Sequence, residues 1–106
     1  MTHNISIILK ALSEKIQPLY GDKWVKMILY GSQARGDAQA GSDIDVLIVL
    51  KGDVNPSVEV SRIVPITTAL SLQYNVVISC AFISEEKLHN RDNPFVLNVQ
   101  REGVSV

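Results

Sequence analysis

Residues 31–45 gather the side chains of this chain that are best suited to chemistry. The stretch reads GSQARGDAQAGSDID, with a glycine-serine pair at Gly31 and Ser32 and two aspartates at Asp43 and Asp45. A glycine lets the backbone approach a ligand closely, and the free N–H groups at a helix start favour phosphate. Ser32 adds a hydroxyl donor at the same place. This turn is therefore a candidate phosphate site.

The two aspartates are separated by one residue at the start of an apolar run. Side chains alternate along a strand, so Asp43 and Asp45 are expected on the same face, with α-carbons roughly 6.5 to 7 Å apart. Two carboxylates this close repel each other unless a cation lies between them or both reach water. Carboxylates together with substrate phosphates are the usual ligands of Mg²⁺. The spacing favours a magnesium site.

Each feature taken singly also has a purely structural explanation. Gly-Ser turns are common, Asp43 could cap the strand entry after Ser42, and Asp45 could be a solvated edge residue. The combination changes the interpretation, because it places anion donors and metal ligands in one short segment. That is the equipment for moving a phosphoryl or nucleotidyl group.

Two strands must hold this segment. Residues 24–30 (WVKMILY) are β-branched and aromatic, and residues 44–50 (IDVLIVL) become apolar on both faces, as in a central strand covered on both sides. The thirteen residues 31–43 between them are long for a hairpin turn, so we expect a turn of helix within them.

Stretches with helical periodicity lie before the first of these strands and after the second. An apolar stripe follows Asn4 and ends near Pro18 and Gly21, and a second helix is expected over residues 56–74. Pro65 lies inside the second helix and should kink or split it, because proline lacks the N–H and crowds the preceding turn.

The C-terminal third is predicted to hold one more strand and two helices. Residues 75–83 (NVVISCAFI) read as the strand, a short helical piece begins at Ser84, and a last helix begins at Asn93 and stops at Gly103. The order predicts an α/β (α+β) fold, a small sheet with helices packed on it. The pattern does not settle parallel or antiparallel pairing.

Composition limits the classes of protein to which this chain can belong. The 106 residues are 46% hydrophobic and 20% charged with a net charge of −1, which predicts one domain over residues 1–106. Lysines and arginines are scattered, so no dedicated nucleic-acid groove is expected. No apolar run approaches the roughly 20 residues of a membrane span, and the single cysteine, Cys80, fits a reducing compartment. A cytoplasmic, soluble protein is expected.

The stretch GSQARGDAQAGSDIDVLIVL resembles the Gly-Ser-x-Ala-x-Gly, Ser-Asp-x-Asp motif of the DNA polymerase β-like nucleotidyltransferase superfamily. The short length is similar to that of the minimal, MntA-like nucleotidyltransferases, and the ending VISCAFISEEKLHNRDNPFVLNVQREGV to that of a bacterial subset. The matching residues, in order, are Gly31, Ser32, Ala34, Arg35, Gly36, Ser42, Asp43 and Asp45.

The resemblance implies a nucleotidyltransferase fold with a mixed sheet. Gly31 and Ser32 would hold the β- and γ-phosphates of ATP or another nucleoside triphosphate, and Asp43 and Asp45 would coordinate two Mg²⁺ ions. An acceptor hydroxyl would attack the α-phosphorus and release pyrophosphate.

The same resemblance places two further residues, Ser42 and Arg35, in the nucleotide-binding set. The sequence leaves open whether Arg35 faces the triphosphate or forms a structural ion pair, and the second role is weighed slightly ahead.

One departure from the family pattern stands out. Active members carry a third carboxylate on the later strand, whereas residues 75–80 read NVVISC, without an acid. The nearest acids, Glu85 and Glu86, lie beyond that strand. Three outcomes follow: slow catalysis by two acids, completion of the site by a partner or by Glu85, or nucleotide binding without turnover.

The resemblance therefore implies a Mg²⁺-dependent enzyme that moves a nucleoside monophosphate, AMP from ATP, onto a hydroxyl. The acceptor would be a helical HEPN-type partner protein, with this chain as the antitoxin of a toxin-antitoxin pair. The alternative is a catalytically degenerate module that binds nucleotide or partner. A third hypothesis is an oligomer formed through the sheet edge or an apolar helix face.

Overall fold

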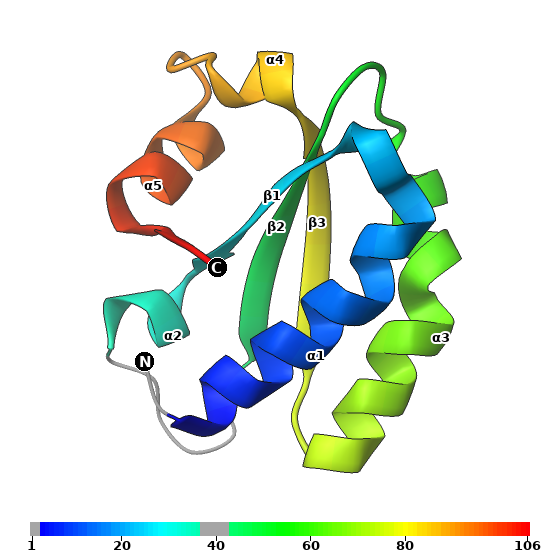
Figure 1. Cartoon of the computed structure of the whole chain (residues 1–106). Coiled ribbons are helices and arrows are strands. Elements are labelled where there is room, and N and C mark those ends of the chain that lie inside the picture. Colours follow the sequence, from blue (N-terminus) through cyan, green and yellow to red (C-terminus); the bar gives the residue numbers. More distant parts are fainter. Residues whose placement is uncertain (1–2, 37–42) are drawn as a thin grey trace.

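The computed structural model describes residues 3–36 and 43–106 and shows four strands with helices packed around them (Figure 1). The elements, in chain order, are α1 (His3–Tyr20), η1 (Gly21–Lys23), β1 (Trp24–Tyr30), α2 (Ser32–Arg35), β2 (Ile44–Leu50), α3 (Pro56–Tyr74), β3 (Ile78–Ser84), α4 (Glu85–Leu88), α5 (Pro94–Glu102) and β4 (Val104–Ser105).

The strands form one mixed sheet in the order β3-β2-β1-β4. β1 pairs antiparallel with β2 and places Tyr30 opposite Asp45, whereas β2 and β3 are parallel and place Asp45 beside Ser79. The mixed sheet expected from the resemblance is confirmed, and the structure settles the pairing that the pattern left open.

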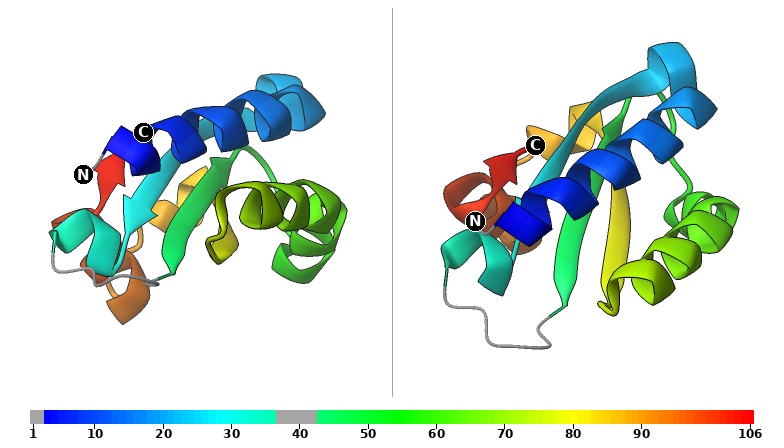
Figure 2. Two further views of the ribbon diagram at one scale, coloured as in Figure 1. Left: turned by 90° about the horizontal axis from the view of Figure 1, so that it is seen from below. Right: turned by 60° about the horizontal axis from the view of Figure 1, so that its bottom comes forward.

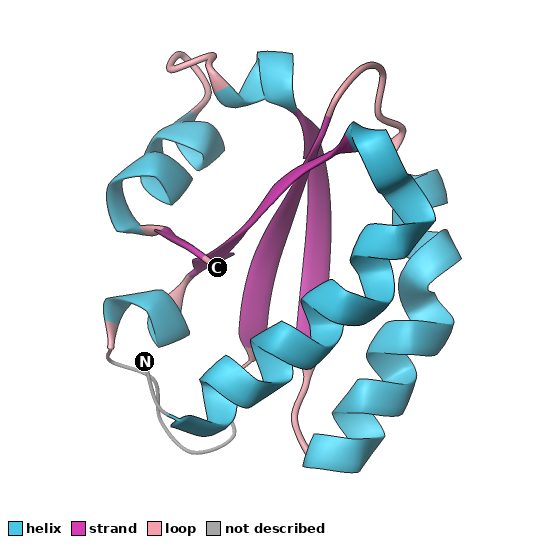
Figure 3. Cartoon of the chain, viewed as in Figure 1, coloured by secondary structure: helices cyan, strands magenta, loops and turns pink. Residues whose placement is uncertain are grey.

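Helices cover both faces of the sheet, which forms the middle layer (Figure 3). One core lies between the sheet and α1 with α3, and a smaller one between the sheet and α4 with α5, so α5 is on the other side of the sheet from α1 (Figure 2). None of the helices in the described part of the chain combines the length and apolar character of a membrane span.

β2 is buried on both faces, as its sequence predicts. Val46 and Ile48 contribute to the core under α1 and α3, and Leu47 and Val49 to the core under α5. Because faces alternate, Asp45 lies on the α5 side, next to the smaller core.

α3 runs as one helix through Pro65, so the predicted split is wrong. Pro65 is exposed, and its ring therefore points away from the core. The hydroxyl of Thr67, two residues later, donates to the carbonyl oxygens of Val64 and Ile63, at 3.2 and 3.4 Å.

β3 begins at Ile78, three residues later than predicted. Asn75 takes the left-handed conformation, with φ of 53°, and ends α3, and the N–H of Val76 donates to the carbonyl of Ser71. Asparagine tolerates this conformation and often ends a helix there. The turn was not predicted, because most of residues 75–83 are apolar and the whole stretch was assigned to the strand.

The predicted starts of α4 and α5, at Ser84 and Asn93, are confirmed, and both residues cap the N-terminus of their helix. The Ser84 hydroxyl accepts from the N–H of Lys87, and the Asn93 amide oxygen accepts from the N–H of Phe95. The two-residue β4, which follows Gly103 and pairs with β1, was not predicted.

Candidate functional site

The acid pair lies at the end of the sheet where β1 ends and β2 begins, beside α2 (Figure 1). Asp43 is exposed and precedes β2, and Asp45 is half-buried as the second residue of that strand. The apolar run that follows fixes β2 in the core, and therefore fixes the backbone that carries both carboxylates.

Gly31 brings the phosphate turn against this pair. It has φ of 74° and ψ of −158°, a combination that only glycine adopts readily. A β-carbon at this position would lie 2.7 Å from Oδ2 of Asp45. The backbone of Gly31 therefore approaches the carboxylate at a distance that any side chain would prevent, and the two halves of the motif meet.

α2 follows Gly31 directly, so the helical turn expected within residues 31–43 is present. The N–H groups of Ala34 and Arg35 donate to the carbonyl of Gly31, both at 3.1 Å. The N–H groups at the start of such a turn have no acceptor within the helix. Ser42, the other expected nucleotide-binding residue, lies outside the described residues.

Asp45 is electrostatically perturbed. Burial raises the pKa of its carboxyl above the usual value of 3.8, and the neighbouring Asp43 raises this pKa further. Tyr30, opposite Asp45, also has a raised pKa, first through burial and then through the charge of Asp45. The site therefore concentrates negative charge in a partly dry environment.

This raised pKa predicts a pH dependence of stability. A carboxyl with a higher pKa in the folded state binds more protons there, so the free energy of unfolding falls as pH rises from the unfolded value, near 3.8, through the folded value. Asp45→Asn should remove this loss and raise the melting temperature at neutral pH. Thermal unfolding of both proteins between pH 4 and pH 8 measures it, and parallel curves would contradict it.

The donor set fits a divalent cation. Two carboxylates from one strand face would repel less with a cation between them, and Mg²⁺ is commonly held by one or two carboxylates plus substrate phosphates. Within residues 3–36 and 43–106 no group of three or more His, Cys, Asp or Glu residues forms a cage. The remaining ligands would have to come from substrate and water.

Residues 5–99 match the sequence model of a family described as "Nucleotidyltransferase domain". The chain belongs to this nucleotidyltransferase family. A protein of Methanocaldococcus jannaschii named "Putative protein adenylyltransferase" is 41% identical over 98 residues, which are 89% of this chain and 92% of that protein. A second protein of this name and organism is 39% identical over 72 residues, 68% of this chain and 72% of its own.

Solved structures agree on the fold. A structure described as a "putative minimal nucleotidyltransferase" is 26% identical, with a TM-score of 0.54 and 92% of each chain covered. A chain of a toxin-antitoxin structure with AMP-PNP is 19% identical, with a TM-score of 0.59 over 98% of this chain and 72% of that one.

On the neighbouring strand β3, the residue beside Asp45 is a serine, Ser79, and not an acid. Ser79 pairs in register with Asp45 and is exposed, so its side chain points from the same sheet face as Asp45. Glu85 follows the opposite end of β3, six residues or roughly 20 Å further along the strand. Glu85 therefore does not complete the site, and that expectation is removed.

Arg35 forms an ion pair within the chain, the role weighed slightly ahead from the sequence, with a partner that the sequence did not identify. Its Nη1 lies 3.2 Å from Oε2 of Glu102, at the end of α5. A hollow of about 210 Å³ lies beside the pair and is lined in part by Tyr30, Gly31 and Phe95. The partners are 67 residues apart, and no local pattern joins them.

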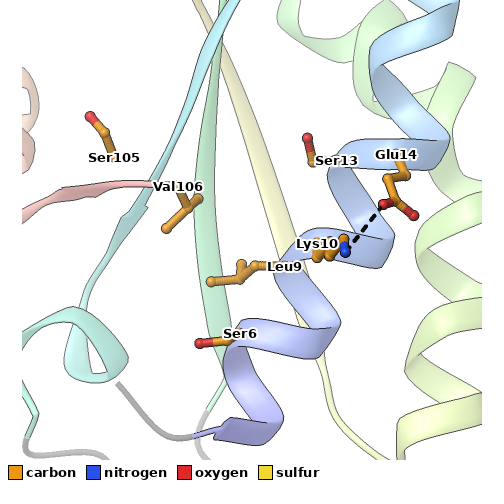
Figure 4. Close-up of a pocket in the computed structure, with 7 residues that line it drawn as sticks. All are labelled: Ser6, Leu9, Lys10, Ser13, Glu14, Ser105 and Val106. Carbon is orange, nitrogen blue, oxygen red and sulfur yellow. Dashed lines mark ion pairs between the residues drawn. The ribbon is translucent and has the colours of Figure 1, made fainter.

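Other features of the nucleotidyltransferase lie away from the acid pair. A hollow of about 370 Å³ between α1 and the β4 edge is lined by Leu9 and Val106, on the other side of the sheet from Asp45 (Figure 4). Burial raises the pKa of the Cys80 thiol to about 12, and this half-buried side chain packs against the larger core.

Proposed function

We propose that this nucleotidyltransferase transfers a nucleoside monophosphate, AMP from ATP, to a hydroxyl of a partner protein. One observation carries the proposal: the backbone of Gly31 lies against the Asp45 carboxylate, so close that a β-carbon at this position would displace it. This contact supports one site in which the glycine-serine turn binds phosphate and the acids bind metal.

Each residue has a distinct part in this proposal. Gly31, Ser32 and Ser42 bind the phosphates, and Asp43 with Asp45 hold Mg²⁺ against the triphosphate. When bound, the metal lowers the pKa of an attacking hydroxyl and offsets charge on the leaving group. The chain supplies orientation, because the buried strand β2 carries Asp45 and directly follows Asp43.

The acceptor reaches the acids from the β3 side. α2 and α5 occupy the β1 side, where Arg35 meets Glu102. On the β3 side, Ser79 is exposed, and so is Val77, whose carbonyl accepts from the N–H of Ile44. The relatives named as protein adenylyltransferases support a protein as the acceptor.

We take the partner to be a helical toxin of the HEPN type. Support comes from the fold shared with a toxin-antitoxin structure that contains a nucleotide analogue. The test incubates the full chain with Mg²⁺, the partner and ATP labelled at the α-phosphate. Labelled partner and released pyrophosphate are expected. Binding of Mg-ATP without label transfer would instead identify a nucleotide-binding module, which the serine at position 79 favours as the second candidate.

Ser79→Asp tests whether the missing acid limits the reaction. A carboxylate beside Asp45 would complete the acid set, and base catalysis of this kind contributes about a hundredfold or more. We expect transfer to rise at least tenfold, roughly. Initial rates at saturating Mg-ATP measure it.

Ser79→Asn is the matched control, since it has the same shape without the charge. If Asn raises the rate as much as Asp, or if neither does, the missing acid does not limit the reaction.

A further inference from the structure

α2 is weakly anchored by apolar contacts. Its four residues include none that is buried, although Ala34 is half-buried against the larger core. Hydrophobic burial therefore contributes little to holding this turn. Yet Gly31 and Ser32 must keep their positions if the phosphate turn is to stay beside Asp45.

α5, in contrast, is firmly fixed. Val96 and Val99 are almost completely buried against β1 and β2, and Asn93 caps the helix start. Glu102 stands in the last turn, where the helix dipole disfavours a carboxylate. Its position there is better explained by what it contacts than by the helix it belongs to.

The contact joins the two helices. The Arg35 guanidinium donates to the Glu102 carboxylate at 3.2 Å, with the side chains 43% and 41% exposed. Next to it, the Phe95 ring of α5 packs edge-on against Tyr30, the residue before Gly31, with centroids 5.5 Å apart. α5 thus contacts the strand end on one side of Gly31 and α2 on the other.

We propose that Glu102 is a positioning residue that acts through Arg35 and holds the phosphate turn at Gly31 and Ser32 against Asp45. This inference rests on the proposed function, since it concerns the same triphosphate site. It assigns Arg35 to an ion pair within the chain and adds Glu102, at the far end of the sequence, to the residues on which nucleotide affinity depends.

The test is a charge exchange between the two residues. Glu102→Arg should weaken binding of Mg-ATP about fivefold. A surface ion pair changes an equilibrium constant by up to about this factor, and the substitution replaces the attraction by a repulsion. Arg35→Glu combined with Glu102→Arg restores the attraction and should recover most of the affinity. Titration calorimetry on the full chain measures the dissociation constants. Melting temperatures should differ little, because partly exposed pairs contribute little to stability.

Glu14→Lys is the matched control. It disrupts an ion pair of α1, Lys10 with Glu14 at 4.0 Å, which lies at the α1 hollow on the other side of the sheet (Figure 4). Affinity for Mg-ATP should not change in this variant. An equal loss in Glu14→Lys and Glu102→Arg would overturn the proposal. So would a loss in Arg35→Glu that the exchange does not recover, which would make Arg35 a direct phosphate ligand.

Hydrogen exchange separates this inference from the proposed function. Amides of residues 32–36 should exchange faster in Glu102→Arg than in the wild type, without nucleotide, and the exchanged pair should slow them again. If the wild type binds no Mg-ATP but the amides behave in this way, the proposed function fails and the positioning of α2 stands. Unchanged exchange in Glu102→Arg overturns the positioning role.

Discussion

Asp45→Asn should lower transfer of AMP about a hundredfold to a thousandfold while the chain stays folded. The substitution removes one of the two carboxylates that we propose as ligands of a divalent cation. It leaves the shape of the side chain unchanged, and β2 keeps its burial on both faces. Asp43→Asn should show a loss of the same order, and the double variant should be inactive. Label transfer from ATP at saturating Mg²⁺ measures all three.

The melting temperature of Asp45→Asn should rise while its transfer activity falls, and this excludes unfolding as the cause of the lost activity. Asp45 has a raised pKa in the folded protein, so its charge opposes folding at neutral pH. A variant that melts at a higher temperature and yet loses transfer cannot have failed by unfolding.

Asp53→Asn is the matched control for the acid pair. Asp53 is exposed and follows the other end of β2, away from Gly31. Transfer should be the same as in the wild type. If Asp43→Asn and Asp45→Asn also transfer at the wild-type rate, the acid pair is not the metal site.

The sequence was sufficient to predict those elements whose position depends on one local physical signal. β1 and β2 have the predicted bounds. Each is a run of alternating or continuous apolar residues flanked by glycine or acids, and this pattern fixes where a strand begins and ends. Side-chain capping at Ser84 and Asn93 is equally local. The placement of Asp45 on the α5 side of β2 follows from the period of two, whereas Asp43 precedes the strand.

Features that depend on distant contacts were not predictable. The left-handed Asn75 is different, because it is local and the predicted end of α3 at residue 74 could have indicated it. The pairing of Arg35 with Glu102 requires α5 to return beside α2, and the opposition of Ser79 to Asp45 requires the parallel register of β3. The sequence showed that residues 75–80 carry no acid, and the register of β3 shows that Ser79 is the residue that lies beside Asp45.

Gly31→Ala should abolish most nucleotide binding, with affinity for Mg-ATP at least tenfold weaker, roughly, and a larger loss of transfer. Two causes combine. The backbone conformation costs a non-glycine residue about 1 to 3 kcal/mol, and the new methyl group would lie 2.7 Å from Oδ2 of Asp45. Calorimetry and label transfer at 25 °C, with folding checked by circular dichroism, measure the effect.

Gly52→Ala separates the two causes. Gly52 also has a positive φ, 79°, but nothing lies within 4 Å of the position that a β-carbon would take, and it sits beyond the other end of β2. Its alanine variant should lose stability and keep nucleotide affinity. An equal loss of affinity at both positions would show that backbone strain, and not displacement of Asp45, explains the defect.

The clash at Gly31 should harm function more than stability, because the atom it meets is the end of a side chain that can rotate away. Rotation relieves the contact cheaply but turns the carboxylate from its position beside the phosphate turn. Gly31→Ala should therefore lose less affinity in an Asp45→Asn background than in the wild type, since part of its effect passes through that carboxylate. Full additivity of the two losses would mean that Gly31 and Asp45 act separately, and the close approach of backbone to acid would then have no part in nucleotide binding.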